Sequence, residues 1–264
     1  MENPESKKPQ DIDARLHSDS RNLLAEMEKL IGRAKVLLLE KGDAVPTATL
    51  GGVLYADRSK PRVPEKDWVA LVDAIARAEP VALHRLYERA HGVVFALISR
   101  LTGDREAAAR LTLDVFQDVW RQAPEFDRHN STVLAWIMNL ARARAIGGRA
   151  GDPVVAIDTS YSSDWSEPEW ENVAPGISVK MLATDDDRHM VSMLVRLVPG
   201  GDYPPHNHAG VEELHLLEGE LWIDGRKLRA GDYNRAEPGT ADNRVWSETG
   251  CMCVLVTSTL DVLR

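Results

Sequence analysis

The stretch PPHNHAGVEELHLLEG, residues 204–219, places two histidines one residue apart, a pair of glutamates close behind, and an alternating apolar run that ends in Glu-Gly. In an extended chain, side chains two positions apart point to the same face. His206 and His208 would therefore converge, and Glu212 follows them on the next strand. The arrangement predicts a metal site on a framework of β-strands.

Short alternating runs punctuated by Gly and Pro continue on both sides of this stretch. They are ISVKML, HMVSMLVRLVP, EELHLLEGELWIDG, RKLRAGDYNRAEPG and GCMCVLVTSTL. Regularly spaced short strands of this kind favour an all-β sandwich or barrel from about residue 176 onward. Cys251 and Cys253 lie on the last run, where we expect buried core thiols rather than a disulfide.

The spacing G-x5-H-x-H-x3-E-x6-G, which begins at Gly200, resembles the first motif of the cupin barrels. Its register makes Glu212 the ligand, whereas Glu213 and His215 face away from the ligand side. The second cupin motif normally places a histidine three residues after a Pro-Gly pair, and here that position is Asp242.

The resemblance implies a divalent metal held by His206, His208, Glu212 and Asp242. A carboxylate in place of the fourth histidine makes the donor set harder, which shifts its preference from zinc toward manganese or iron. Within the cupins, residues 165–258 resemble the C-terminal domain of the zinc-binding anti-sigma factors of the ChrR type, through PGISVKML, HNHAGVEELHLLEGEL and RVWSETGCMCVLV. That likeness implies zinc and a sensor of oxidative stress.

Upstream of these strands the sequence is helical. Residues 67–146 show no strand-like alternation and predict helices at about 67–78, 80–102, 104–122 and 130–146, separated by Pro, Gly and Asp residues. We therefore expect an α + β chain of two domains, a helical bundle followed by an all-β cupin barrel.

The expected division of the chain has three parts. Residues 1–66 hold a disordered tail, one amphipathic helix at about 13–41 and a linker rich in Pro and Gly. Residues 67–150 form the helical domain, and residues 151–264 form the cupin domain.

Two blocks of the helical part, DVFQDVWRQAPEFD and VLAWIMNLARARAI, resemble region 2 of bacterial sigma factors of the extracytoplasmic-function group. The resemblance implies that the helix at 111–122 docks on RNA polymerase and that the next helix helps to open promoter DNA. The docking candidates, expected to be exposed, are Asp114, Gln117, Asp118 and Arg121. The candidate DNA contacts are Arg128, Asn139, Arg142 and Arg144.

Two features depart from the sigma-factor pattern. After Ile146 the chain continues as Gly-Gly-Arg-Ala-Gly-Asp-Pro, which stops the helix where the family has basic residues that recognise the −10 element. The β module also stands where the family has a second helix-turn-helix module for the −35 element. Docking on the polymerase is therefore better supported than promoter recognition.

Charge and hydropathy set further limits. The net charge is −9, and residues 151–264 carry 9 Lys+Arg against 20 Asp+Glu, so the β module is a poor surface for nucleic acid. No apolar run approaches the roughly 18–20 residues of a bilayer span, and the polar N-terminus lacks the apolar core of a signal peptide. We expect a cytoplasmic protein with no membrane partner.

The function that we expect is transcription regulation, in which the sigma-like bundle contacts core RNA polymerase and promoter DNA while the cupin senses a stress or ligand signal. One alternative is a metal-dependent cupin enzyme of the dioxygenase kind, which is disfavoured because an enzyme gains nothing obvious from a polymerase-binding helix. The other is a protein that sequesters a sigma factor or the polymerase. A homodimer through the cupin or the N-terminal helix is left open.

Overall fold

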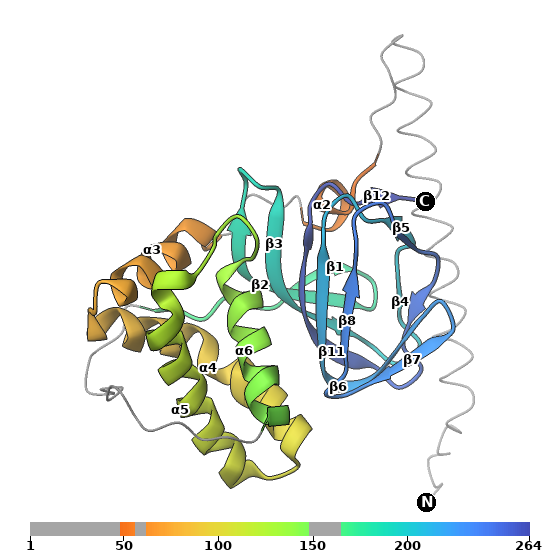
Figure 1. The fold of residues 1–264 in the computed structure, drawn as a ribbon. Helices are drawn as coiled ribbons and strands as arrows, with labels where there is room; N and C mark the ends of the chain where they lie inside the picture. Colours follow the sequence, from red (N-terminus) through yellow and green to blue (C-terminus); the bar gives the residue numbers. More distant parts are fainter. Residues whose placement is uncertain (1–47, 56–61, 148–164) are drawn as a thin grey trace, which may run out of the picture.

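The computed structural model describes residues 48–55, 62–147 and 165–264. In these residues a helical region is followed by a curled antiparallel β half-barrel, called the barrel below (Figure 1). The expected α + β architecture is thereby confirmed. The predicted tail at 1–12 and helix at 13–41 lie outside the described residues. Each helix among the described residues is too short or too polar to cross a lipid bilayer.

Helices α3 to α6 form the bundle, and local sequence rules set their ends. α4 ends at Gly103, whose φ of 66° lies in the left-handed region that glycine adopts without strain. The Asp104 side chain then caps α5 by accepting hydrogen bonds from the N–H groups of Glu106 and Ala107. The bounds are Glu65–Ala76 for α3, Pro80–Thr102 for α4, Arg105–Gln122 for α5 and Val133–Gly147 for α6, with a 3-10 turn, η1, at Ala123–Glu125.

Two antiparallel sheets form the barrel. The larger sheet has the order β1-β2-β3-β11-β6-β10-β4, with β7 and β8 also paired to β6, and the smaller sheet has the order β12-β5-β9. The long strand β6 therefore joins most of the barrel together. The bounds are Glu171–Ala174 for β1, Ile177–Asp185 for β2, Met190–Leu197 for β3, Asp202–Tyr203 for β4, His206–Asn207 for β5, Glu212–Ile223 for β6, Arg226–Arg229 for β7, Tyr233–Ala236 for β8, Ala241–Asp242 for β9, Val245–Trp246 for β10, Cys251–Ser258 for β11 and Val262–Leu263 for β12.

Residues 48–55, which the sequence suggests are linker, pack on the barrel. They form the short helix α2, Leu50–Leu54. Figure 1 shows α2 beside β12 at one end of the barrel. Leu50, Leu54 and Tyr55 are buried in the apolar core inside the barrel. This segment therefore belongs structurally to the cupin, although the whole bundle lies between them in the sequence.

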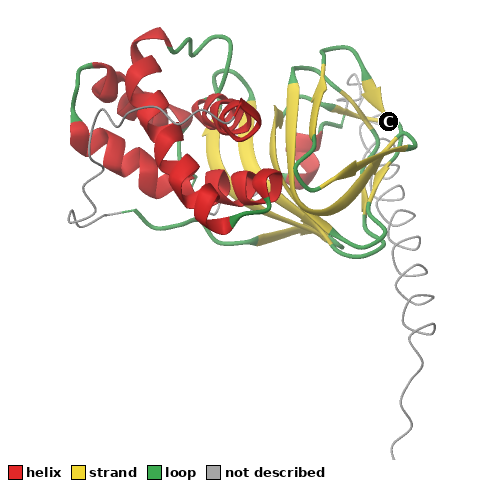
Figure 2. Ribbon diagram, turned by 60° about the horizontal axis from the view of Figure 1, so that its bottom comes forward, coloured by secondary structure: helices red, strands yellow, loops and turns green. Residues whose placement is uncertain are grey.

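Two apolar cores organise the described part of the chain. One fills the inside of the barrel, and the other joins the helices to the outer face of the larger sheet. The outward-facing strand residues in this second core include Leu182 of β2, Leu194 of β3, Leu217 of β6 and Val254 of β11. Figure 2 shows helices lying against one face of the curled sheet. Bundle and barrel therefore share a core.

The first residue of α3 anchors the start of α6. Glu65 is 3% exposed, and its Oε1 accepts a hydrogen bond of 2.6 Å from the N–H of Val133, the first residue of α6. Such a bond satisfies one of the free N–H groups at a helix start. Burial raises the pKa of Glu65 from 4.5 to about 7, although the Val133 hydrogen bond acts in the opposite direction.

A raised carboxyl pKa at this position makes the fold less stable as pH increases. Between about pH 4.5 and 7 the folded chain keeps a proton on Glu65 that the unfolded chain has released, so the free energy of unfolding falls across this window. Glu65→Gln keeps an acceptor for the Val133 N–H without the buried charge. We expect the variant to match wild type at pH 5 and to be more stable at pH 8 by about 2 kcal/mol. Urea unfolding at the two pH values measures this, and a difference that does not change with pH would contradict it.

Candidate metal centre

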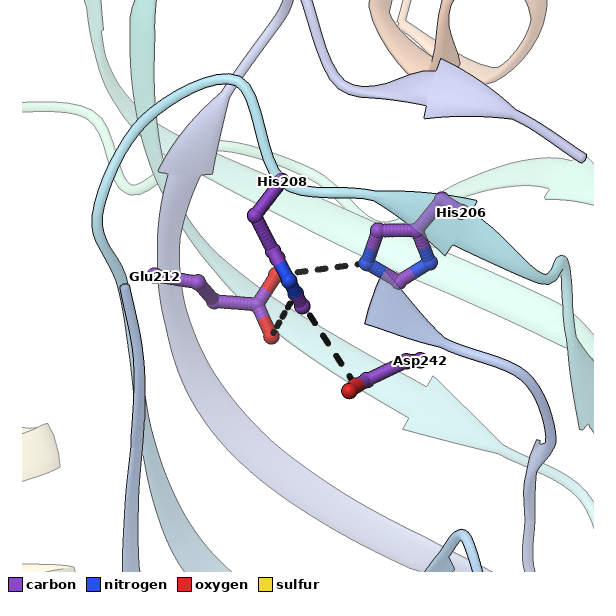
Figure 3. Close-up of side chains that lie close together, drawn as sticks. All are labelled: His206, His208, Glu212 and Asp242. Carbon is purple, nitrogen blue, oxygen red and sulfur yellow. Dashed lines mark ion pairs between the residues drawn. The ribbon is translucent and has the colours of Figure 1, made fainter. Parts of the chain in front are cut away.

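The four side chains that the sequence predicts as metal ligands meet inside the barrel, as Figure 3 shows. His206 lies on β5, His208 follows it, Glu212 begins β6 and Asp242 ends β9. One potential ligand atom from each lies within 4.8 Å of the others, and all four side chains are buried. The register of the small sheet contributes to this, because His206 and Asp242 are directly opposite each other across β5 and β9.

Hydrogen bonds fix both imidazole rings with one nitrogen toward the centre. His206 Nδ1 lies 2.8 Å from the carbonyl oxygen of Pro204, which can only accept, so Nδ1 carries a proton. His208 Nδ1 lies 3.1 Å from Thr240 Oγ1, whose own hydrogen goes to the Glu237 carbonyl at 2.7 Å. In the neutral rings each Nε2 atom therefore carries a lone pair that is free to bind a cation. Neither Nε2 has a hydrogen-bond partner in the part of the chain that the structure describes.

The separations between ligand atoms suit a shared cation better than direct hydrogen bonds. His206 Nε2 is 3.8 Å from Glu212 Oε2, and His208 Nε2 is 3.7 Å from Glu212 Oε1. His208 Nε2 is also 3.9 Å from Asp242 Oδ2. These distances exceed a hydrogen bond, whereas atoms bound about 2.0–2.2 Å from one ion lie roughly 3–3.5 Å apart. Buried imidazole nitrogens without hydrogen-bond partners, facing two carboxylates, therefore fit a divalent cation.

The four groups also determine each other's protonation. Burial alone would lower the pKa of His208, but the Glu212 carboxylate outweighs it and raises that pKa to about 8. Burial alone would raise the pKa of Glu212, but the two imidazoles outweigh it and hold the pKa below its usual range. Burial raises the pKa of Asp242, and Glu212 acts in the same direction. A cation entering the site would therefore compete with protons for the imidazole nitrogens.

Thr257 and Asp261 support the ligand Glu212, and sequence reasoning missed both. Thr257 Oγ1 lies 2.9 Å from Glu212 Oε2 and 2.6 Å from Asp261 Oδ2, and all three side chains are buried. Partners of this kind orient metal ligands. The alternation along β11 could have indicated Thr257. It lies two and four residues after Leu255 and Cys253, so all three side chains point into the barrel.

A small cavity adjoins the ligands. It is lined by His206, Glu212 and Asp242 together with apolar side chains and the thiols of Cys251 and Cys253. Its volume of about 20 Å³ is room for roughly one water molecule. Burial raises the pKa of Cys251 to about 11 and raises that of Cys253 as well, as expected for core thiols.

The four docking candidates on α5 differ in their exposure. Arg121 is exposed and Asp114 is half-buried, but Gln117 and Asp118 are only 6% and 8% exposed. The expectation of an exposed set is therefore wrong for Gln117 and Asp118. Arg144 of α6 donates from Nε to Asp118 Oδ2 at 2.6 Å, and Arg121 donates to Asp118 Oδ1 at 2.9 Å. Asp118 thus joins α5 to α6 inside the bundle.

Two of the four candidate DNA contacts are engaged within the bundle. Arg144 forms the ion pair with Asp118. Arg128 is exposed and lies 3.2 Å from Asp73 of α3. Of Arg128 and Arg144, only Arg128 has the solvent exposure that a phosphate contact needs.

The other two candidates, on α6, face the barrel. Asn139 Nδ2 donates to Glu213 Oε1 at 3.1 Å, and Arg142 Nη1 donates to the Gly231 carbonyl at 2.6 Å. The Arg142 guanidinium also lies 5.7 Å from the ring centroid of Tyr233, whose hydroxyl donates to Glu213 at 2.7 Å. In this structure neither side chain is free to meet DNA, contrary to expectation.

Solved structures similar to the chain include RmlC-like cupins. The protein from Shewanella frigidimarina is 23% identical, with a TM-score of 0.32, over 37% of this chain and 92% of that one. The protein from Ralstonia eutropha is 16% identical, with a TM-score of 0.32, over 35% of this chain and 64% of that one.

Sequence comparisons match both parts of the chain. The ECF RNA polymerase sigma factor SigK of Mycolicibacterium vanbaalenii is 27% identical over 124 residues, which are 47% of this chain and 61% of that protein. SigK of Mycobacterium bovis BCG is 30% identical over 80 residues, which are 30% of this chain and 43% of that protein. The chain thus spans about half the length of these curated relatives. Residues 160–261 match the family described as the ChrR cupin-like domain. The C-terminal part of this chain is therefore a ChrR cupin-like domain, and the region before it is similar to the ECF sigma factor SigK.

Proposed function

We propose that this chain is a cytoplasmic transcription regulator, in which the sigma-like bundle contacts RNA polymerase and promoter DNA and the cupin controls when α6 is free to act. One observation carries the proposal. The barrel holds α6 through Asn139 and Arg142, which are residues that the sigma-factor resemblance assigns to DNA. The barrel in this position covers part of α6, and release of α6 from the barrel would expose that part.

The contacts with the barrel run along α6. At its start, Ser192 Oγ of β3 lies 3.2 Å from Thr132 Oγ1 in a buried contact. Further along, Asn139 and Arg142 bond to the outer side of the barrel. Polar contacts at the start of a helix and in its middle and second half fix its position, since each group would lose a partner if the helix moved away. The barrel therefore restrains the whole helix.

Neighbouring residues of β6 serve the ion site and the interface with the helix. Glu212 points inward to the imidazoles, and Glu213 points outward to Asn139 and Tyr233. Adjacent strand residues alternate between faces but share a peptide unit, so a shift of Glu212 toward a cation also moves Glu213. Occupancy of the ion site and the hold on α6 are coupled through this strand.

In this proposal His206, His208, Glu212 and Asp242 hold a divalent cation. When bound, the cation would supply positive charge in place of the imidazole protons. Zinc is implied by the likeness to ChrR-type cupins, whereas two carboxylate ligands favour manganese or iron. A stress signal or a small ligand that removes or alters the cation would loosen the hold on α6.

On the polymerase side, α5 offers an apolar residue that sequence reasoning passed over. Leu113 is 46% exposed and stands next to Asp114. An exposed leucine beside charged residues can insert into a partner surface, with the charges setting its orientation. Leu113, Asp114 and Arg121 are therefore the docking residues that we propose for the polymerase.

A pull-down of core RNA polymerase with tagged full-length protein tests this proposal. We expect wild type to capture the polymerase and Leu113→Asp to reduce capture at least about tenfold, because a buried carboxylate at the contact is costly. Val81→Asp is the matched control, because Val81 is a similarly exposed apolar residue, 36% exposed, on α4. Its capture should equal that of wild type.

The other outcomes of the pull-down contradict the proposal. Failure of wild type to capture polymerase would overturn the polymerase contact. Retention of a free sigma factor instead would identify a sequestering protein. Equal losses in Leu113→Asp and Val81→Asp would show that α5 is not the docking helix.

A further inference from the structure

Residues 48–55, called the strap below, are attached to the end of the barrel where the ion site lies. The strap provides none of the four ligands, yet Leu50 and Leu54 are 0% and 4% exposed. Its main-chain hydrogen bonds run from Leu50 N–H to the Asp261 carbonyl (2.8 Å), from Gly51 N–H to the Thr259 carbonyl (3.1 Å) and from Leu263 N–H to the Ala48 carbonyl (3.0 Å). The strap thus contacts the C-terminal residues of the barrel, which surround the ligands.

A first connection to the ligands passes through the small sheet. Thr49 forms a β-bridge with Val262 of β12. β12 pairs with β5, where Leu263 is opposite His206, and β5 pairs with β9, where His206 is opposite Asp242. The strap is therefore the next member of the sheet that carries two of the four ligands.

A second connection passes through Asp261, which is fully buried. Its main-chain carbonyl accepts the N–H of Leu50 in the strap. Its Oδ1 accepts the N–H of Ala209 at 2.7 Å, in the loop between the two histidines and the glutamate ligand. Its Oδ2 lies 2.6 Å from Thr257, which is in turn 2.9 Å from Glu212. One aspartate thus connects the strap, the ligand loop and a ligand.

A third connection passes through two tyrosines inside the barrel. The hydroxyl of Tyr55, at the end of the strap, is hydrogen-bonded to the hydroxyl of Tyr203, and the contact is buried. The Tyr203 ring packs edge-on against the His206 ring, with centroids 5.7 Å apart. The strap therefore also supports the ring that carries one of the two unpartnered nitrogens.

We infer that the strap is a positioning element of the ion site. Attached to the barrel, it holds His206, Glu212 and Asp242 in a geometry that binds a divalent cation, and its detachment weakens that binding. The inference rests on the metal site of the proposed function. Since outer partners of metal ligands typically contribute 10–100-fold to affinity, detachment of the strap should weaken binding by roughly that factor.

Two adjacent glycines of α2 give a matched pair of variants. A Cβ on Gly51 would lie 2.6 Å from Thr259 Cβ and 2.9 Å from Thr259 Cα, closer than real Cβ atoms approach, so in Gly51→Ala the strap and residue 259 must move apart. A Cβ on Gly52 would meet only Thr49 Oγ1, at 3.3 Å. Both changes place alanine in the same short helix, so their effects on helix propensity are alike.

The experiment measures affinity for Zn²⁺ and for Mn²⁺ in the full-length variants, by competition with a chelating dye. We expect Gly51→Ala to bind at least about tenfold more weakly than wild type, and Gly52→Ala to bind like wild type. Hydrogen exchange of the metal-free proteins is the second readout. The amides of residues 206–212, including the Ala209 N–H bonded to Asp261, should exchange faster in Gly51→Ala alone.

Tyr55→Phe is a milder variant in case Gly51→Ala does not fold. It keeps the buried ring but removes the hydroxyl that contacts Tyr203, and we expect a smaller loss of affinity in the same direction. Unchanged affinity in both Gly51→Ala and Tyr55→Phe, with wild type binding metal, overturns the inference. A wild type that binds neither ion overturns the metal site itself, and unchanged exchange of residues 206–212 in Gly51→Ala would then overturn the positioning role as well.

Discussion

Glu212→Gln should nearly abolish binding of a divalent cation in the barrel, while Glu213→Gln should change the affinity far less. Glu212 faces both imidazoles at 3.7–3.8 Å and lies in the enclosed interior, so its charge is the main attraction for a cation there. Loss of that charge should lower affinity by at least about 100-fold, more than the loss of an outer partner does. At a free metal concentration about 100 times Kd, the free energy of unfolding of wild type should rise by about 2.7 kcal/mol. That of Glu212→Gln should not change at the same metal concentration.

The control uses the same chemical change one residue further along the same strand. Glu213 points to the opposite side, where its Oε1 accepts hydrogen bonds from Asn139 and Tyr233. Metal content after chelation and reloading, together with the melting temperature at increasing metal concentration, distinguishes the two variants. Equal metal binding by Glu212→Gln and wild type would show that the site lies elsewhere.

Asp118→Ala should lower the free energy of unfolding by about 1.5–3 kcal/mol, the usual worth of hydrogen bonds to a charged group. The Arg144 side chain is 15% exposed and would keep its charge without the carboxylate that it meets through two nitrogens. Arg121, the second partner, is more exposed and can turn toward solvent. The loss would therefore come mainly from Arg144.

Asp114→Ala, one turn earlier on α5, is the control, and we expect it to cost less than about 1 kcal/mol because its side chain is only half-buried. Urea unfolding followed by tryptophan fluorescence measures both variants. A loss below about 1 kcal/mol for Asp118→Ala would contradict a structural role. A loss of the expected size means that any transcription defect of an Asp118 variant reflects unfolding of the bundle rather than loss of docking.

Periodicity predicted much of the architecture because it reports which side chains share a face. Alternation along β6 separated Glu212 from Glu213, and the structure places them on opposite sides of the strand. The break between α4 and α5 followed from Gly103 and Asp104, whose roles are set by local backbone geometry and capping. These features depend on residues close together in the sequence.

The features that the sequence did not predict depend on contacts between distant residues. Residues 48–55 look like a linker because of Gly51 and Gly52, and only the close approach to Thr259 explains why a glycine stands there. Helical periodicity placed Asp118 on α5 but could not reveal that Arg144 of α6 covers it. One signal of the covered barrel face was present, since strand β6 carries the apolar residue Leu217 on the side opposite its ligand Glu212.

The shared core of helices and strands gives the chain a single cooperative unit of folding. If the bundle and the sheet were separated, Leu182, Leu194, Leu217 and Val254 would be exposed to water. Each fully buried leucine or valine is worth about 1.5–3 kcal/mol relative to exposure, so neither half would melt independently of the other. A ligand bound in the barrel would therefore raise the melting temperature of the helices too, so the helices that carry the sigma-like surface would be stabilised by binding at a distant site.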